Sequence, residues 1–89
     1  MSSALDAEVS NDGMAVSMAK AVAIANRRAV FLGIDLQGSF VSAAQKPSKG
    51  GVVWRVSYIP RDYIGKRGGG FMIEVDPADG SIRRELRGQ

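Results

Sequence analysis

Apolar and polar residues alternate most regularly in two stretches of the second half of the chain, residues 52–59 and 71–76. The apolar positions that share one side are Val52, Trp54, Val56 and Tyr58 in the first stretch, and Phe71, Ile73 and Val75 in the second. Side chains alternate along a strand, and a sheet with one buried face requires this pattern. The two stretches therefore predict neighbouring strands, with Trp54 and Tyr58 in the core and Arg55 and Glu74 on the opposite, outward side.

Residues 76–80 have the composition of a tight turn into a further strand. Pro77 presets the backbone angle φ at the second turn position, and Gly80 accepts the left-handed conformation that closes a hairpin. In the strand that follows, residues 81–86, the alternation places Ile82, Arg84 and Leu86 inward and Arg83 and Glu85 outward. An inward arginine suits an edge strand, where its charged tip reaches water.

Residues 14–32 carry a helical pattern, because their apolar positions recur at steps of three and four. These positions are Met14, Met18, Ala21, Val22, Ala25, Ala29 and Leu32. Polar residues 11–13 offer helix-start chemistry, and Gly33 is the predicted stop. The helix is unusually apolar, which fits an alanine-rich core helix, a sheet that curls around it, or a helix that joins a second copy of the chain.

A first strand is expected over residues 40–45, with Phe40, Ser42 and Ala44 on one face, followed by a loop over 46–51. Together the elements predict an α+β fold, with an N-terminal helix packed on an antiparallel meander of three or four strands. Residues 1–12 are small, polar and acidic, and we expect a flexible N-terminal segment. Residues 13–89 are expected to form a single α+β domain.

Composition narrows the chemistry, because the 89 residues include neither cysteine nor histidine. Thiol catalysis, histidine general-base catalysis and ordinary zinc ligation are thereby excluded. We expect no catalytic residue, no metal and no cofactor, and hence a protein that is not an enzyme. The longest apolar run, residues 14–25, is broken by Ser17 and Lys20 and predicts no membrane span. The first ten residues lack the basic start of a signal peptide, and the sequence leaves the compartment open.

The net charge of +3 is unevenly distributed along the chain. Residues 1–45 carry three basic and four acidic side chains, whereas residues 46–89 carry nine and five. Such a bias favours an acidic protein, nucleic acid or an anionic surface, although a solvated basic face would look the same.

The loop over residues 60–70 is the predicted binding site. Its proposed partner-binding residues are Arg61, Tyr63, Lys66, Arg67, Gly68, Gly69 and Gly70. Glycines let a backbone approach a ligand closely, and the cations suit a carboxylate or phosphate. A phosphate-binding P-loop would need serine or threonine where Arg67 stands. The alternative is a mobile hairpin connection whose charges keep it in water.

A small acidic group, Glu74, Asp76 and Asp79, lies near the turn. Carboxylates of this kind can bind calcium or transfer protons, but the calcium-loop spacing is absent. Asp76 and Asp79 are also the residue types that the turn itself prefers, so we expect a structural role for them.

Three segments together resemble the PepSY domain. They are residues 21–25 (Ala-Val-Ala-Ile-Ala), 54–57 (Trp-Arg-Val-Ser) and 73–82 (Ile-Glu-Val-Asp-Pro-Ala-Asp-Gly-Ser-Ile). The family's pattern is a helix followed by strands that end in an acidic-Val-Asp hairpin with a later glycine. The resemblance covers roughly residues 14–86 and implies a PepSY- or cystatin-like fold, a periplasmic or secreted setting, and a module that inhibits or modulates a peptidase.

The same region is similar to small bacterial immunity proteins with an NTF2-like fold, through Trp54-Arg55-Val56 and Gly69-Gly70. That likeness implies a protein that neutralises a toxin. Both resemblances imply a non-enzymatic protein-binding module, with a peptidase or a toxin as the partner. A weak nucleic-acid-binding domain that uses the basic loop is the alternative, and a homodimer through the apolar helix or strand exchange is a further expectation.

Overall fold

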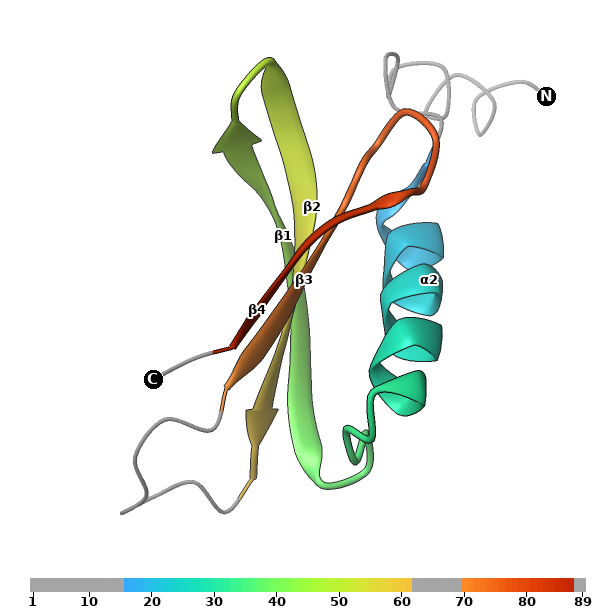
Figure 1. Ribbon diagram of the computed structural model, residues 1–89, viewed down its shortest axis with the longest axis vertical. Coiled ribbons are helices and arrows are strands. Elements are labelled where there is room, and N and C mark those ends of the chain that lie inside the picture. The colour runs from blue at the N-terminus through green and yellow to red at the C-terminus, as the bar shows by residue number, and fades with distance from the viewer. Residues whose placement is uncertain (1–15, 62–69, 88–89) are drawn as a thin grey trace, which may run out of the picture.

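The computed structural model describes residues 16–61 and 70–87. Within these residues, one helix precedes four strands (Figure 1). Their bounds are α2 Met18–Phe31, β1 Ser39–Ser48, β2 Gly51–Pro60, β3 Phe71–Val75 and β4 Ile82–Arg87.

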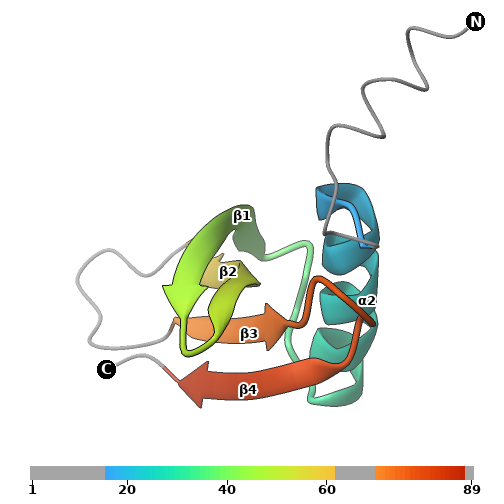
Figure 2. The ribbon, with the colours of Figure 1, turned by 90° about the horizontal axis from the view of Figure 1, so that it is seen from above.

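The four strands form one antiparallel sheet in the order β1-β2-β3-β4, and α2 packs on one side of it (Figure 2). Each strand therefore pairs with its neighbour along the chain, as in a meander. The predicted α+β fold with a four-stranded antiparallel sheet is confirmed. Among the described helices, none is long and apolar enough to cross a membrane.

The helix begins at Met18 rather than at the predicted Met14. Ser17 is the N-cap, and its hydroxyl accepts a hydrogen bond from the Lys20 N–H at 3.2 Å. The expected start at residues 11–13 lies outside the described residues. At the other end, Gly33 follows the helix with φ of +88°, as predicted for the stop.

Val16 connects the start of the helix to the sheet through two hydrogen bonds. Its N–H donates to the Pro77 carbonyl at 3.0 Å, and its carbonyl accepts from the indole N–H of Trp54 at 2.9 Å. Val16 is itself buried, so these bonds satisfy polar groups that water cannot reach. The residue is thus held in a non-helical conformation by the turn after β3, a contact that the local pattern could not reveal.

An alanine stripe, Ala21, Ala25 and Ala29, is the face of α2 that meets the sheet. All three are fully buried. Their spacing of four places them one above another on the helix, and their small side chains let the helix approach the strands closely. Met18, which the helical pattern placed on the same face, is 47% exposed, because the contact is narrower than predicted.

The other half of the core comes from the two central strands, as their alternation predicted. The buried residues that they contribute are Trp54, Val56, Tyr58, Phe71, Ile73 and Val75. Val52 departs from the pattern, with 38% exposure. In β1, Phe40, Ser42 and Ala44 do share a face, but Ala43 lies opposite the buried Val56, so their face is the one turned away from the helix.

A bulge overturns the predicted faces of the last strand. Val75 pairs with Ile82 and Glu74 pairs with Arg84, so that Arg83 is the extra residue. One extra residue moves every later side chain to the opposite face. Glu85 therefore points toward α2, where it pairs with Arg28, while Leu86 lies on the opposite face from that predicted.

The two described hairpin turns also refine the predictions. The expected hairpin turn within 46–51 is present but shorter than predicted, because β1 and β2 continue until Ser48 pairs with Gly51, which leaves Lys49 and Gly50 as the turn. Gly50 has φ of +79°, in the left-handed region that glycine adopts without steric cost. The turn over 76–80 is confirmed, since the Gly80 N–H donates to the Asp76 carbonyl at 2.9 Å.

Enlarging the alanine stripe should destabilise the fold. We expect Ala25→Leu to lower the free energy of unfolding by about 1–3 kcal/mol, because the added atoms have no space between helix and sheet. Ala23→Leu is the matched control on the exposed side of the same helix and should change it by less than about 0.5 kcal/mol. Urea unfolding followed by circular dichroism measures both, and equal effects would contradict this packing.

Burial of Tyr58 predicts a loss of stability at high pH. Its hydroxyl donates to Asn26 Oδ1 at 2.8 Å, and burial raises the pKa of Tyr58 to about 12 from 10.0. The folded state thus favours the neutral phenol, and this contribution is complete below pH 10 and lost as the pH rises toward 12. Over that interval, the free energy of unfolding should fall more steeply for the wild type than for Tyr58→Phe. Parallel curves would refute the assignment.

Candidate functional site

The sheet face turned away from α2, which we call the outer face, is covered by no helix or strand among the described residues. Its members follow from the strand register: Phe40, Ser42, Ala44, Lys46, Ser48, Val53, Arg55, Ser57, Ile59, Met72, Glu74, Arg84 and Leu86. Val53 and Glu74 are buried, and the others are partly or fully exposed. A sheet face of this kind is open to a partner.

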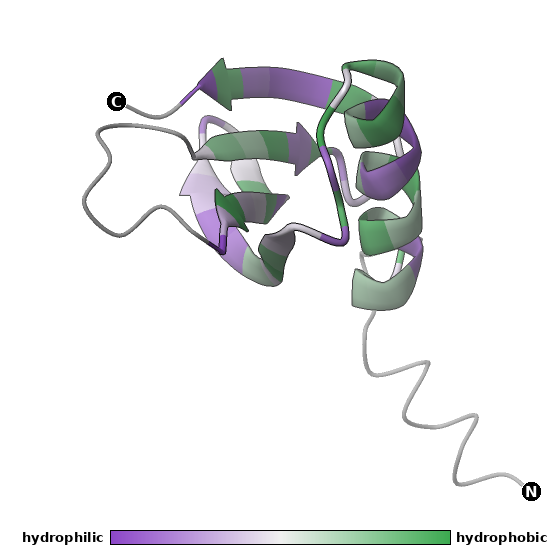
Figure 3. Cartoon of the chain, turned by 90° about the horizontal axis from the view of Figure 1, so that it is seen from below, coloured by the Kyte–Doolittle hydropathy of each residue, from purple (hydrophilic) through white to green (hydrophobic). Residues whose placement is uncertain are grey.

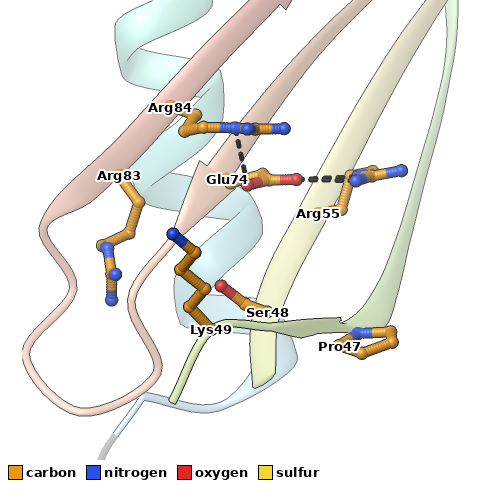
Figure 4. Close-up of a pocket in the computed structure, with 7 residues that line it drawn as sticks. All are labelled: Pro47, Ser48, Lys49, Arg55, Glu74, Arg83 and Arg84. Atoms are coloured by element: carbon orange, nitrogen blue, oxygen red, sulfur yellow. Dashed lines mark hydrogen bonds and ion pairs between the residues drawn. The ribbon is translucent and has the colours of Figure 1, made fainter. Parts of the chain in front are cut away.

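One end of the outer face is hollowed around Glu74, with a volume of about 430 Å³ (Figure 4). The residues that line this basic hollow are Pro47, Ser48, Lys49, Arg55, Glu74, Arg83 and Arg84. They come from the β1–β2 turn and from all four strands, which the meander brings together. The hollow is thus a product of strand pairing and not of any single segment.

Glu74 lies between two arginines in register across three strands. Arg55 donates to Glu74 Oε2 through Nε at 3.0 Å and Nη2 at 2.7 Å, and Arg84 Nε lies 3.4 Å from Oε1 (Figure 4). The carboxylate is only 6% exposed, whereas the side chains of Arg55 and Arg84 are 28% and 58% exposed. The three residues form an ion-pair triad whose negative centre is covered and whose positive flanks face solvent.

The hollow holds more positive than negative charge. Arg83 pairs with Asp76 at 2.8 Å, and Lys49 has no ion pair with a described carboxylate. Four cations, Lys49, Arg55, Arg83 and Arg84, therefore face two carboxylates, Glu74 and Asp76, which leaves a net charge of +2. Lys49 and the outer nitrogens of Arg84 are the groups that can receive an added anion.

The opposite end of the outer face is apolar. Phe40 and Ile59 lie opposite each other on β1 and β2 and are 55% and 39% exposed. The Arg61 guanidinium lies over the Phe40 ring, 4.8 Å from its centroid. Of the two C-terminal strands, β4 is more hydrophilic than β3 (Figure 3). The outer face therefore combines an exposed aromatic end with a basic hollow.

Most of the predicted binding loop lies outside the described residues, namely Tyr63, Lys66, Arg67, Gly68 and Gly69. Arg61 is described and has structural bonds: its N–H donates to the Gly38 carbonyl at 2.8 Å, and its Nε donates to the Gln37 carbonyl at 3.0 Å. Gly70 is described and directly precedes β3. The loop as a partner-binding site stays a prediction.

The three predicted acidic residues do not form one group. Asp76 accepts from the Ala78 N–H at 2.7 Å, and Asp79 accepts from the Ser81 N–H at 2.8 Å, as the turn requires. The Ser81 backbone N–H lowers the pKa of the Asp79 carboxyl below its ordinary value. Glu74 belongs to the basic hollow instead. No cluster of carboxylates that could hold a metal ion exists within residues 16–61 and 70–87.

Sequence reasoning did not find the basic hollow. The one feature of the sequence that pointed to it was the placement of Arg55 and Glu74 at outward positions of two predicted strands. Only the register makes them partners, and only the bulge brings Arg84 to the same face.

Comparison of the chain with protein-family models, curated proteins and solved structures gave no match. The PepSY-like and NTF2-like resemblances therefore stay predictions. What the chain can bind has to be argued from the outer face itself.

A double-mutant cycle should show that the triad acts as a unit. Arg55→Met leaves a covered carboxylate with one longer ion pair, and should lower the free energy of unfolding by about 1–3 kcal/mol. Adding Glu74→Leu removes that unpaired charge, so the double variant should recover much of the loss. Urea unfolding of the four proteins gives the coupling energy, and simple additivity would contradict the triad.

Proposed function

We propose that the protein is a non-enzymatic protein-binding module whose outer face receives a partner that carries an exposed carboxylate beside apolar side chains. The observation that carries this proposal is the combination, on one uncovered sheet face, of the basic hollow and the exposed apolar pair Phe40 and Ile59. The charges of the basic hollow would fix the orientation of the partner, while the apolar pair would supply contact area, as in protein interfaces.

The chemistry of the hollow favours a carboxylate. Arginine presents planar donors that match a carboxylate in pairs, and Glu74 already occupies such a position within the chain. A carboxylate of the partner would meet Arg84 and Lys49 from the solvent side.

A protein partner accounts for the outer face better than nucleic acid does. A nucleic-acid backbone requires a continuous track of cations. Beyond the hollow, Lys46 is the one charged residue of the described strands on the outer face, which otherwise carries uncharged residues such as Ser42, Ser57 and Met72. An acidic protein surface needs only a local group of cations, which the hollow supplies.

The peptidase modulator and the toxin-neutralising immunity protein are specific forms of this proposal. They rest on the sequence resemblances alone. Either partner would present an acidic or apolar segment to the outer face, so one experiment on ligand chemistry addresses both.

Selection from a phage-displayed peptide library tests the proposal without knowledge of the partner. We expect peptides that bind the wild type to be enriched in aspartate or glutamate next to apolar residues. Lys49→Gln with Arg84→Gln should weaken their binding about tenfold or more, because charge-assisted hydrogen bonds are lost. Lys20→Gln with Arg27→Gln removes the same charge from the exposed side of α2 and is the matched control.

Two kinds of result would count against the proposal. One concerns the peptides: those selected lack acidic residues, or they bind both double variants equally well. The other is that labelled DNA binds more tightly than any peptide, with an affinity that falls steeply as salt rises, which would make the hollow a phosphate-binding surface.

A further inference from the structure

The two edges of the sheet differ in how they are protected. β4 carries Arg83, Arg84, Glu85 and Arg87, and the bulge at Arg83 interrupts its regular pairing. Charged residues and bulges are the usual means of preventing an edge strand from pairing with another chain. β4 therefore has the features of an edge that stays unpaired.

β1 lacks these features over most of its length. Residues 39–45 contain no charged residue, and the pairing of β1 with β2 continues from Ser39 to Ser48 without a bulge. Only Lys46 and Pro47, near its end, are residues that discourage pairing. No other strand in the described part of the chain lies beyond β1.

The register shows which backbone groups of β1 point outward. The Arg61 N–H donates to the Gly38 carbonyl, so this pair belongs to the hydrogen-bonded set of the ladder. By alternation, Phe40 and Ser42 bond to β2, while Val41 and Ala43 direct their N–H and C=O groups away from the sheet. Pro47 also falls at an outward position, where its missing N–H costs no bond to β2, and this agrees with the assignment.

We infer that β1 pairs antiparallel with β1 of a second copy of the chain, with Val41 opposite Ala43 of that copy and the two Ser42 residues facing each other. The N–H and C=O groups of Val41 and Ala43 then find partners in both copies. The sequence around Ser42 is uncharged in both directions, and Phe40 lies opposite the small Ala44 of the second copy, so the strand is complementary to itself. It offers no charge with which a different protein strand could be selected.

The proline favours this register over the one centred on Ala43. Lys46 lies opposite Gly38 of the second copy, so that the two lysines do not face each other. A shift by one residue that centres the pairing on Ala43 instead places Pro47 opposite Ser39, where its missing N–H would lose a bond. A two-fold axis perpendicular to the sheet then places both outer faces on the same side, which gives one continuous sheet with two basic hollows.

This pairing does not depend on what the hollow binds, and it differs from a dimer through the helix. One pair of strands buries less than a stable interface of about 1,600 Å² does, so the association should be weak and concentration-dependent. Sedimentation equilibrium should show a mass that rises from 9.5 kDa toward twice that value as the concentration increases.

Charge exchange at Ser42 is the decisive test. Ser42→Lys and Ser42→Glu each bring like charges together across the axis, so each variant alone should stay monomeric. An equimolar mixture brings opposite charges together and should associate again. Ser57→Lys adds the same charge to the outer face at the neighbouring strand, away from the axis, and should dimerise like the wild type.

The inference is overturned if the wild type is monomeric at every concentration, or if Ser42→Lys associates as well as the wild type does. Circular dichroism confirms that each variant is folded. Hydrogen exchange of the wild type gives a second measurement that needs no variant: the Val41 and Ala43 amides should become protected as the concentration rises. Unchanged exchange at these two amides would also overturn the pairing.

Discussion

The close contact between the alanine stripe of α2 and the two central strands is the constraint on which the rest of the structure depends. Ala21, Ala25 and Ala29 are fully buried, so the helix approaches the sheet without large side chains between them. The bulk of the core must then come from the strands, chiefly from Trp54, Tyr58 and the apolar residues around them. The 14-residue α2 covers one face of the sheet, and no other helix or strand within residues 16–61 and 70–87 covers the second face.

The outer face carries charges that neutralise one another around Glu74, and elsewhere in the described strands it combines apolar and uncharged polar residues with Lys46. Glu74 is stable beneath the surface because Arg55 and Arg84 lie beside it in register, and both arginines keep their outer edges in water. The same arrangement that satisfies the carboxylate leaves cations free to meet a second one. Structural stability and the proposed binding chemistry thus have a common origin in the pairing of three strands.

Local sequence patterns predicted the helix and the strands. The exact helix start and the faces of β4 depend on contacts between residues far apart in the sequence, which local patterns do not show. Alternation identified the buried faces of β2 and β3, because burial repeats every second residue in any regular strand. The helix start was misplaced, since the bonds of Val16 to Pro77 and Trp54 connect residues far apart in sequence. The bulge at Arg83 reversed the faces of β4, and without it the basic hollow could not be predicted, although Arg55 and Glu74 were already assigned outward.

The central claim is that the outer face is the binding surface, and nuclear magnetic resonance tests it most directly. A short peptide of alternating glutamate and leucine would be added to the ¹⁵N-labelled protein. The account predicts saturable shifts at Lys49, Arg84 and the Arg55 side chain, with the signals of Lys20 and Arg27 on α2 unchanged. Shifts centred on α2, or none at the basic hollow, would contradict it.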